Sequence, residues 1–404
     1  MERKRIGIIG GGPAGLMAAD VLAPYCDVHI YEQGKSLGRK FLVAGQGGFN
    51  LTNSAEGSAL KEAYSPPGLL DEALSAFGPT ELCAWLQEMG IGTYVGTSGR
   101  VFPTRGIKPI EVLQAIRERL VARGVHFHLE HAFVGFDDKA RPIIENSAGR
   151  SPVEADFFLF ALGGASWPVT GSNGTWSSLF GSIGLEIAPF RSSNCGINVA
   201  WPPHFVAAHA GKPLKNIRVT SGGRSILGEA TITEHGLEGN AIYPVVPAVR
   251  DALDSGSAAF VHIDLKPNNT VEQLLHKLSG STPADYPKGL HLERAQLAMV
   301  KAVTPKERFF SPIDLVNDTK HLRVPVTGLR PLDEAISTIG GIRTADLSST
   351  FAFKRFPHLF AIGEMVDWDA PTGGFLLQGC FSMGHHAARS ILRTASSPST
   401  PVEN

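Results

Sequence analysis

Three glycines near the N-terminus have the spacing of a phosphate-binding turn. Gly10, Gly12 and Gly15 form the pattern G-x-G-x-x-G in "GGGPAG". The first glycine allows a tight turn, the second lets backbone approach a pyrophosphate, and the third lets a helix pack on a strand. The pattern predicts that these glycines, with Pro13 and Ala14, contact the phosphates of a dinucleotide at the start of a helix, where the dipole favours negative charge.

A carboxylate follows the glycines at the distance that such a site requires. Glu32 ends the apolar segment "DVHIYE", about twenty residues after the turn, and Gln33 follows it. A carboxylate here accepts hydrogen bonds from the adenosine ribose and repels a 2′-phosphate. The sequence therefore disfavours NADP in this first site and leaves NAD or FAD, with Glu32 and Gln33 as predicted contacts.

The elements that must position these residues are readable from the apolar pattern. "RIGIIG" at 5–10 predicts a buried strand, and "PAGLMAADVLA" at 13–23 predicts a helix with proline in its first turn. Residues 27–32 predict a second strand. Strand, turn, helix and strand in this order indicate an α/β fold with a Rossmann-like dinucleotide-binding domain.

A glycine-rich loop, "GRKFLVAGQGGFNLTN" at 38–53, follows this unit. Its cations Arg39 and Lys40 offer charge-assisted donors to phosphate, and glycines such as Gly47 let backbone approach a flat ring system. Asn50 in the same loop is a further predicted contact. The alternative is a solvated surface loop without a ligand.

Distant segments favour FAD over NAD, because FAD is long and needs contacts from several parts of a chain. "ADFFLFALGGAS" at 155–166 and "HLFAIGEMVD" at 358–367 resemble the A-T-G and G-D segments of two-dinucleotide-type flavoproteins, with Leu162 and Glu364 replacing the usual threonine and aspartate. The FAD contacts expected around these segments are Val134, Ala161, Gly163, Gly363, Glu364 and Asp367.

A glycine pair precedes the last long apolar helical pattern, "APTGGFLLQGCFSMGHHAARSIL". A helix that begins near Gly373, Gly374 and Phe375 would direct N–H groups at the N1/C2-carbonyl edge of a flavin and stabilise negative charge there. Taken alone, the same pattern also fits an ordinary helix start.

In combination, these motifs resemble the aminoacetone-oxidase/BaiN/YhiN-like family of FAD-dependent flavoproteins over nearly the whole chain. "GRVFPTR" at 99–105 and "TGSNG" at 170–174 occur in the family's order as well. Many members read G-R-C-N where this chain has Gly47, Gly48, Phe49 and Asn50. A mechanism that needs a cysteine at that place is therefore disfavoured, and the chain resembles a divergent branch.

The resemblance implies three regions. We expect an FAD-binding domain at 1–190 and 342–404, an inserted β-barrel-like domain at 191–267 and 321–341, and a helical subdomain at 268–320. No second G-x-G-x-x-G follows a strand between 155 and 358. NADH or NADPH would therefore visit only transiently if either reduces the flavin.

The motif positions predict Asn50, Thr52, Arg100, Thr170 and Asn173 as groups that position a substrate. None is a strong acid or base at neutral pH. This favours an oxidoreductase that transfers a hydride between flavin N5 and either an amine or aminoketone or a polarised C=C bond, and the sequence leaves both open. A flavin-binding redox sensor or assembly protein with little turnover is the alternative.

Composition disfavours several partners. The formal net charge is −1 without a basic stripe, which argues against nucleic acid and an RNA-modifying enzyme, and against anionic membranes. The 4 cysteines stand far apart without C-x-x-C, and no apolar stretch reaches a bilayer's width, so we expect a cytoplasmic protein. The sequence indicates no oligomeric state.

A group of histidines at 126–131 is the remaining candidate for a metal site. "HFHLEH" places His126 and His128 on one strand face and His131 on the other. No nearby carboxylate or cysteine completes a ligand set in the sequence, so we expect no metal.

Overall fold

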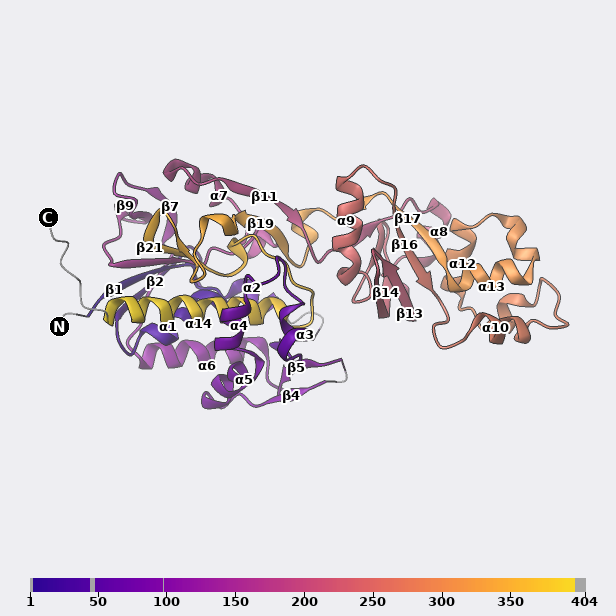
Figure 1. Cartoon of the computed structure of the whole chain (residues 1–404), viewed down its shortest axis with the longest axis horizontal. Helices are drawn as coiled ribbons and strands as arrows, with labels where there is room; N and C mark the ends of the chain where they lie inside the picture. Colours follow the sequence, from indigo (N-terminus) through magenta and orange to yellow (C-terminus); the bar gives the residue numbers. More distant parts are fainter. Residues whose placement is uncertain (1–2, 44–47, 97, 397–404) are drawn as a thin grey trace. The chain divides into compact units, whose positions relative to one another are not determined.

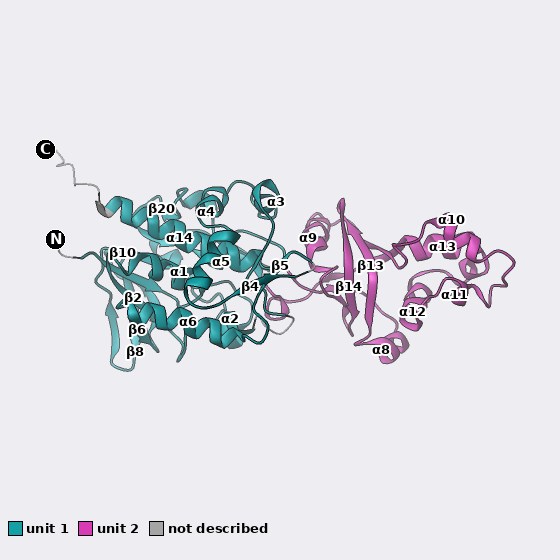
Figure 2. Ribbon diagram, turned by 90° about the horizontal axis from the view of Figure 1, so that it is seen from below, with its two compact units in different colours: residues 1–191, 337–404 teal, residues 192–336 magenta. Residues whose placement is uncertain are grey.

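The structure, a computed structural model, describes residues 3–43, 48–96 and 98–396. The chain divides into two compact units, one of residues 1–191 and 337–404 and one of residues 192–336 (Figure 2). None of the described helices has both the length and the apolar character that crossing a membrane requires. Gly47, a predicted contact, lies outside the described residues.

A six-stranded sheet forms the centre of the first unit. Its neighbours are parallel except for the β20–β21 pair. In order across the sheet, the strands are β20 (Ala352–Phe353), β21 (Phe356–Ala361), β10 (Phe157–Phe160), β1 (Arg5–Ile9), β2 (Asp27–Glu32) and β6 (His126–Leu129). Because Ile9 aligns with both Tyr31 and Phe160, three strands end at one edge. The predicted Rossmann-like α/β fold is confirmed.

Helices cover one face of this sheet and a small meander covers the other. The helices α1 (Pro13–Leu22), α6 (Pro109–Ala122) and α14 (Phe375–Ser396) lie together (Figure 1). The meander has strands β7 (Ala132–Phe136), β8 (Pro142–Asn146) and β9 (Gly149–Pro152). Its Phe133 and Phe136 rings lie 5.3 and 5.5 Å from the buried Phe160 ring of β10. Apolar contact on both faces explains why the central strands β1 and β10 are nearly continuous hydrophobic runs.

Close helix packing depends on glycine where α14 crosses α1. A Cβ atom at Gly384 would lie 2.2 Å from the carbonyl oxygen of Ala14, so only glycine permits this approach. Asp20, 3% exposed on α1, is held by the Trp85 indole N–H at 2.8 Å and by Arg119 at 2.9 Å. These contacts fix the helical layer behind the sheet.

Short elements complete the first unit. A second sheet has the order β3-β5-β4, and β11 pairs with β19. The bounds are β3 (Thr52–Asn53), β4 (Thr93–Val95), β5 (Arg100–Pro103), β11 (Ile187–Ser192), β19 (Thr338–Ile342), α2 (Arg39–Val43), α3 (Gly57–Lys61), α4 (Asp71–Ala76), α5 (Pro79–Glu88) and α7 (Ser177–Phe180).

The second unit is an antiparallel sheet with helices and its own buried core. Its strand order is β17 (Leu322–Val326), β16 (Ala259–Asp264), β13 (Pro213–Ser221), β14 (Arg224–Ile232), β15 (Gly236–Glu238), β12 (Ile197–Asn198) and β18 (Gly328–Leu329). The sheet is open, with β17 and β18 at its edges, whereas the sequence analysis expected a barrel-like domain.

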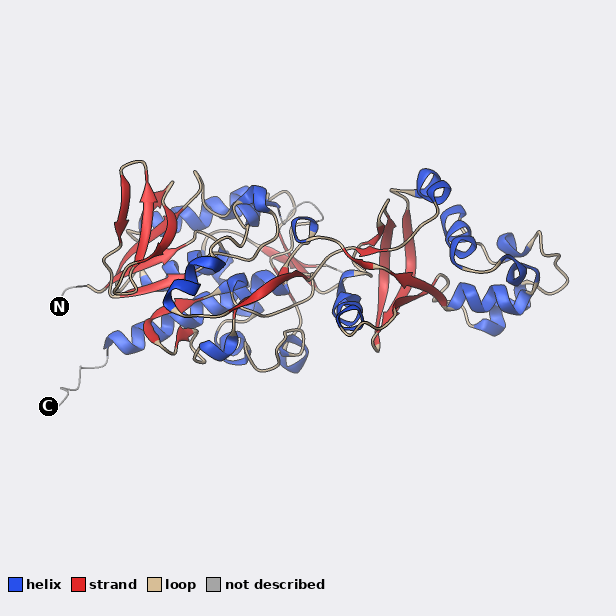
Figure 3. Cartoon of the chain, turned by 90° about the horizontal axis from the view of Figure 1, so that it is seen from above, coloured by secondary structure: helices blue, strands red, loops and turns tan. Residues whose placement is uncertain are grey.

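The second unit also contains helices, and the last four of them lie within residues 268–320, where the sequence analysis expected a helical subdomain. The helices of this unit are α8 (Pro203–His209), α9 (Val246–Asp254), α10 (Val271–Lys277), α11 (Tyr286–Gly289), α12 (Arg294–Val303) and α13 (Pro312–Lys320). Figure 3 shows the last four gathered beside one end of the sheet. The residues expected to form a helical subdomain belong to the same compact unit as the strands.

Candidate functional site

A pocket lies at the edge of the six-stranded sheet where β1, β2 and β10 end. Its walls come from the glycine turn, the end of β2, the start of α2, the segment after β10 and the turn after β21. The predicted residues that line it are Gly10, Gly12, Pro13, Ala14, Glu32, Gln33, Arg39, Lys40, Ala161, Gly163, Thr170, Asn173, Gly363 and Glu364. Segments far apart in the sequence thus meet around one cavity.

The glycine turn provides an open seat in front of α1. A Cβ at Gly10 would lie 2.4 Å from the Ala161 carbonyl oxygen, and one at Gly15 would lie 2.3 Å from the Gly10 carbonyl oxygen. At Gly12, by contrast, a Cβ would meet no atom within 4 Å. Gly12 caps α1 without a side chain, which leaves the first N–H groups for a ligand. This open seat at a helix N-terminus fits the pyrophosphate of FAD.

Glu32 is held rigidly beside this seat. One carboxylate oxygen accepts from the Gly11 N–H at 2.9 Å and the other from the Gly34 N–H at 2.8 Å. Each oxygen keeps a second lone pair, so the carboxylate can still accept hydrogen bonds from ribose hydroxyls. Gln33 donates to the Gly171 carbonyl oxygen at 2.9 Å and links the turn to the opposite wall.

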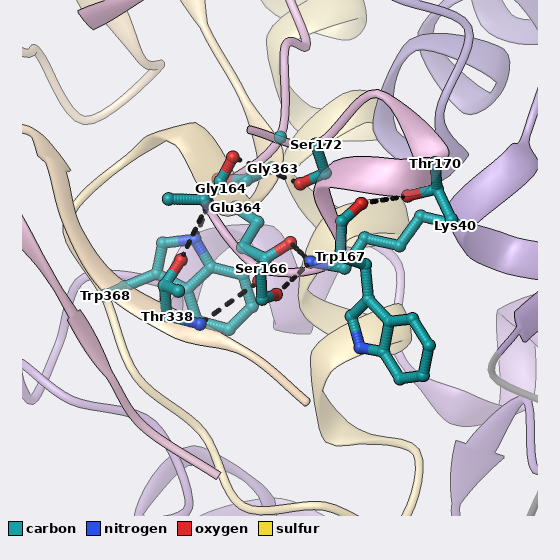
Figure 4. A network of polar contacts seen from close by, with 12 residues as sticks. Lys40, Gly164, Ser166, Trp167, Thr170, Ser172, Thr338, Gly363, Glu364 and Trp368 are labelled. Carbon is teal, nitrogen blue, oxygen red and sulfur yellow. Dashed lines mark hydrogen bonds and ion pairs between the residues drawn. The ribbon is translucent and has the colours of Figure 1, made fainter. Parts of the chain in front are cut away.

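The two cations of the loop contact protein groups in this structure. Lys40 Nζ lies 2.6 Å from Glu364 Oε2 and 2.8 Å from Ser166 Oγ (Figure 4). Arg39 donates to the Val169 carbonyl oxygen at 2.7 Å. Lys40 therefore neutralises Glu364 in the pocket wall, an ion pair that the sequence analysis did not foresee.

A thiol lies close to this ion pair. Cys380 on α14 lines the pocket, and burial, with a further contribution from the nearby Glu364 carboxylate, raises its pKa to about 12. The side chain is therefore a neutral thiol at physiological pH.

The turn after β10 uses its polar side chains to hold its own shape. Thr170 Oγ1 donates to the Trp167 carbonyl oxygen at 2.8 Å (Figure 4), and Asn173 Oδ1 accepts from the Thr175 hydroxyl at 2.8 Å. Trp167 has a φ of 62°, a left-handed conformation that a bulky residue adopts only under constraint. Thr170 and Asn173 line the pocket as members of this constrained turn.

A second group of predicted residues meets at the start of α14. The Asn53 amide donates to the Gly373 carbonyl oxygen at 3.1 Å, and a Cβ at Gly373 would lie 3.5 Å from Arg100 Nε. Arg100 is half-buried, and its side chain makes no hydrogen bond or ion pair within the described part of the chain. The Asn50 amide, in the orientation that satisfies both of its ends, accepts from the Gly374 N–H at 2.5 Å.

Thr52 belongs to the core beneath this group. It is fully buried and donates to Gln378 Oε1 at 2.6 Å. The Gln378 amide in turn donates to the Phe77 carbonyl oxygen at 3.0 Å. This position suits an anchor of α14 better than a group that touches a substrate.

Other predicted contacts lie outside the pocket lining. Asp367 accepts from the Gly340 N–H at 2.8 Å and so ties the turn after β21 to β19. The predicted residues that the structure describes but does not place in the lining are Gly15, Asn50, Thr52, Arg100, Val134, Asp367, Gly373, Gly374 and Phe375.

Sequence reasoning missed several aromatic and polar groups of the wall, namely Tyr31, His131, Phe133, Ser172, Trp176 and Cys380. Tyr31 directly precedes Glu32 at the end of β2, so its place on that strand was a usable signal. Phe133 lies on the meander, Trp176 follows the turn after β10, and His131, Ser172 and Cys380 lie within quoted patterns, but nothing in those patterns pointed these three side chains at the pocket.

Comparison with known proteins agrees with this geometry. The sequence profile described as "HI0933-like protein Rossmann domain" matches residues 4–390. The chain is 25% identical over 409 residues to the 3-dehydro-bile acid delta(4,6)-reductase of Clostridium scindens, with 96% of this chain and 98% of that protein covered. It is 24% identical over 406 residues to the ribosomal RNA dihydrouridine synthase of Haemophilus influenzae, with the same coverage of 96% and 98%.

Solved structures show the same fold. The 3-ketosteroid delta1-dehydrogenase of Sterolibacterium denitrificans superposes with a TM-score of 0.52 at 13% identity, covering 98% of this chain and 100% of that chain. The match of the family profile over residues 4–390 shows that the chain belongs to the HI0933-like Rossmann family of FAD-dependent oxidoreductases.

Proposed function

We propose that the chain reduces a C=C bond polarised by a neighbouring carbonyl, with FAD as the hydride carrier. The observation that carries this proposal is the shared chemistry of two relatives that match from end to end. One is named for reduction of a keto bile acid and the other for formation of dihydrouridine, and both names describe saturation of a C=C bond. The substrates of these two relatives differ greatly. Their names therefore support a C=C bond as the reacting group of the substrate but do not indicate which molecule carries it.

In this proposal the pocket would hold the adenosine and pyrophosphate of FAD, and a neighbouring segment outside the pocket lining would hold the ring system. The seat in front of Gly12 would hold the pyrophosphate, Glu32 the adenosine ribose, and the start of α14 at Gly373 the ring system. When bound, FAD supplies hydride transfer at N5. NADH or NADPH is the proposed transient donor of electrons.

Arg100 is the residue that we assign to the substrate carbonyl. It is half-buried, permanently charged and free of a protein partner within the described residues, and it lies beside Gly373. A guanidinium that donates to the carbonyl oxygen stabilises the negative charge that develops there as the C=C bond accepts a hydride. The hydride adds to one carbon of the C=C bond and a proton must add to the other; none of the predicted substrate-positioning groups is an obvious proton donor, so the proposal assigns this proton to solvent.

Oxidation of an amine or aminoketone is the second enzymatic candidate, since the same positioning groups serve either direction of hydride transfer. We rank it below C=C reduction because neither full-length relative described above is named as an amine oxidase. A redox sensor with little turnover is the non-enzymatic alternative.

RNA remains the critical question about the substrate. The sequence analysis disfavoured nucleic acid because of the net charge, yet two relatives named ribosomal RNA dihydrouridine synthases match nearly the whole chain, so net charge alone does not exclude an RNA substrate. The second unit carries 15 Lys and Arg against 14 Asp and Glu. Such a balance gives little non-specific attraction to phosphate, so we favour a small molecule.

Anaerobic spectroscopy tests the proposal. We expect the purified protein to show flavin absorbance, to be bleached by NADH or NADPH, and to recover its colour when a conjugated enone is added. Arg100→Met should keep the flavin but lower kcat for the enone by about 10²–10³-fold. Arg100→Lys, which keeps the charge but not the planar donor pair, serves as the matched variant.

The other outcomes are equally informative. Bleaching by primary amines alone, with recovery in air, would replace the proposal by an amine oxidase. Recovery on adding ribosomal RNA but not any free enone would make RNA the substrate. Full activity of Arg100→Met would remove Arg100 from the mechanism.

A further inference from the structure

Two imidazoles and one carboxylate converge at the outer edge of the six-stranded sheet. Asp27 Oδ1 lies 3.1 Å from His29 Nε2 and 3.6 Å from His126 Nε2, and all three atoms lie within 4.8 Å of one another. His29 and Asp27 are on β2, and His126 is on β6, in register with His29. Parallel pairing of the two strands thus assembles three possible ligands from two short segments.

Neighbouring groups orient this cluster. Arg5 Nε donates to Asp27 Oδ2 at 2.8 Å, which turns Oδ1 toward the imidazoles. His128 Nε2 lies 2.9 Å from His29 Nδ1. Without an ion, His29 Nε2–H donates to Asp27 Oδ1 and Nδ1 accepts from His128, so a metal would take the place of the Nε2 proton while His128 holds the other side of the ring.

We propose that Asp27, His29 and His126 bind a divalent transition ion, with Zn²⁺ as the best match. Zn²⁺ takes nitrogen and carboxylate ligands at about 2.0–2.2 Å in a tetrahedron, which places ligand atoms about 3.3 Å apart. The separations of 3.1 and 3.6 Å from Asp27 Oδ1 match this spacing, while the His29 and His126 rings stack with centroids 4.6 Å apart and would turn so that both Nε2 atoms face one ion. Mg²⁺ and Ca²⁺ prefer oxygen ligands and do not suit two imidazoles.

The exposure of the cluster allows an ion to enter and leaves a position for water. The side chains of His29, Asp27 and His126 are 16%, 27% and 59% exposed. Arg5 opposes a cation electrostatically, but its charge is shared with the carboxylate that it contacts. The carboxylate that the sequence analysis did not find beside "HFHLEH" is therefore Asp27, supplied by β2.

The geometry assigns this site a structural role. Glu32 at the pocket is five residues from Asp27 along β2, a distance of about 16 Å at the rise of an extended strand. The ion would thus tie the edge strand β6 to β2 without touching a substrate or FAD. Because metal would bind only where the two strands are paired, Zn²⁺ should raise the unfolding temperature.

Zinc titration of the full chain without a polyhistidine tag tests the site. We expect isothermal titration with Zn²⁺ to give one site per chain, and thermal unfolding to shift upward with Zn²⁺. His126→Ala should weaken binding at least about tenfold and abolish the shift. His235→Ala, a histidine of the other unit with 47% side-chain exposure, is the matched control and should behave like the native protein.

A second variant guards against misfolding. Asp27→Asn keeps the side-chain shape and should lose zinc binding as His126→Ala does, while circular dichroism reports whether each variant is folded. Native-like zinc binding in either folded variant would overturn the proposal, and so would a native protein that takes up no Zn²⁺. These outcomes are independent of flavin content and of turnover, so they do not test the proposed reductase activity.

Discussion

Replacing Gly12 by aspartate separates cofactor binding from folding. Gly12 is the N-cap of α1 with φ −83° and ψ 179°, an extended conformation that any residue adopts. A Cβ there meets no atom within 4 Å. Aspartate is also among the best N-cap residues, so the apoprotein should be as stable as the native chain or slightly more stable.

The same carboxylate should expel FAD. It would stand in the seat proposed for the pyrophosphate, and two unit charges about 4 Å apart repel by about 4 kcal/mol at an effective dielectric constant of 20. This corresponds to roughly a thousandfold loss of affinity. The assay is flavin absorbance of the purified variant, followed by fluorescence titration of the apoprotein with FAD and by urea unfolding without FAD.

Gly12→Asn is the matched control, since it has nearly the same volume and no charge. It should weaken FAD binding less than aspartate does, and the difference measures the electrostatic part. If Gly12→Asp purifies with a full complement of flavin, the pyrophosphate does not lie in front of α1. If instead its apoprotein unfolds in much less urea than the native apoprotein, then Gly12 does not have the free space around its Cβ position on which this prediction rests.

Two further predictions concern stability. Asp20→Ala should lower the free energy of unfolding by about 1–3 kcal/mol, because the buried Trp85 N–H loses its acceptor while Arg119 keeps only its ion pair with Glu88, and urea denaturation measures this against Lys35→Ala at an exposed ion pair. His385 stacks on Phe77, and burial, with help from the charge of Arg389, lowers its pKa from 6.5 to about 4. The unfolded chain therefore binds this proton first, so stability should fall as pH drops from about 6.5 to about 4, by up to about 1.4 kcal/mol per pH unit. His385→Gln should flatten that part of the unfolding profile, and an unchanged profile would show that other groups control it.

The glycine turn and Glu32 were predictable because their requirements are local. A tight turn, a close approach and a helix start each restrict the residue at a fixed spacing, and the pattern is therefore visible in the sequence. The contacts behind the pocket were not predictable. Lys40 pairs with Glu364, 324 residues away, and no local pattern connects them.

The candidate substrate residues show the same limit. The motif positions indicated Thr52 and Arg100 equally, but pairing of β3 with β5 and packing on α14 decide that Thr52 is buried while Arg100 is partly open. The zinc ligands depend on the parallel register of β2 with β6, which sets His29 beside His126. Strand order is a tertiary property, so neither distinction was available from residue spacing.

The contact of Gly384 with Ala14 has a consequence for biosynthesis. A ribosome makes the glycine turn before α14, with the whole second unit between them. The part of the pocket wall that Cys380 forms is missing until α14 has emerged and docked on α1. While the second unit is being translated, the nascent chain has the glycine turn of the pocket but not yet α14. We expect flavin uptake to follow the emergence of α14, so binding of the cofactor should not begin while the second unit is being translated.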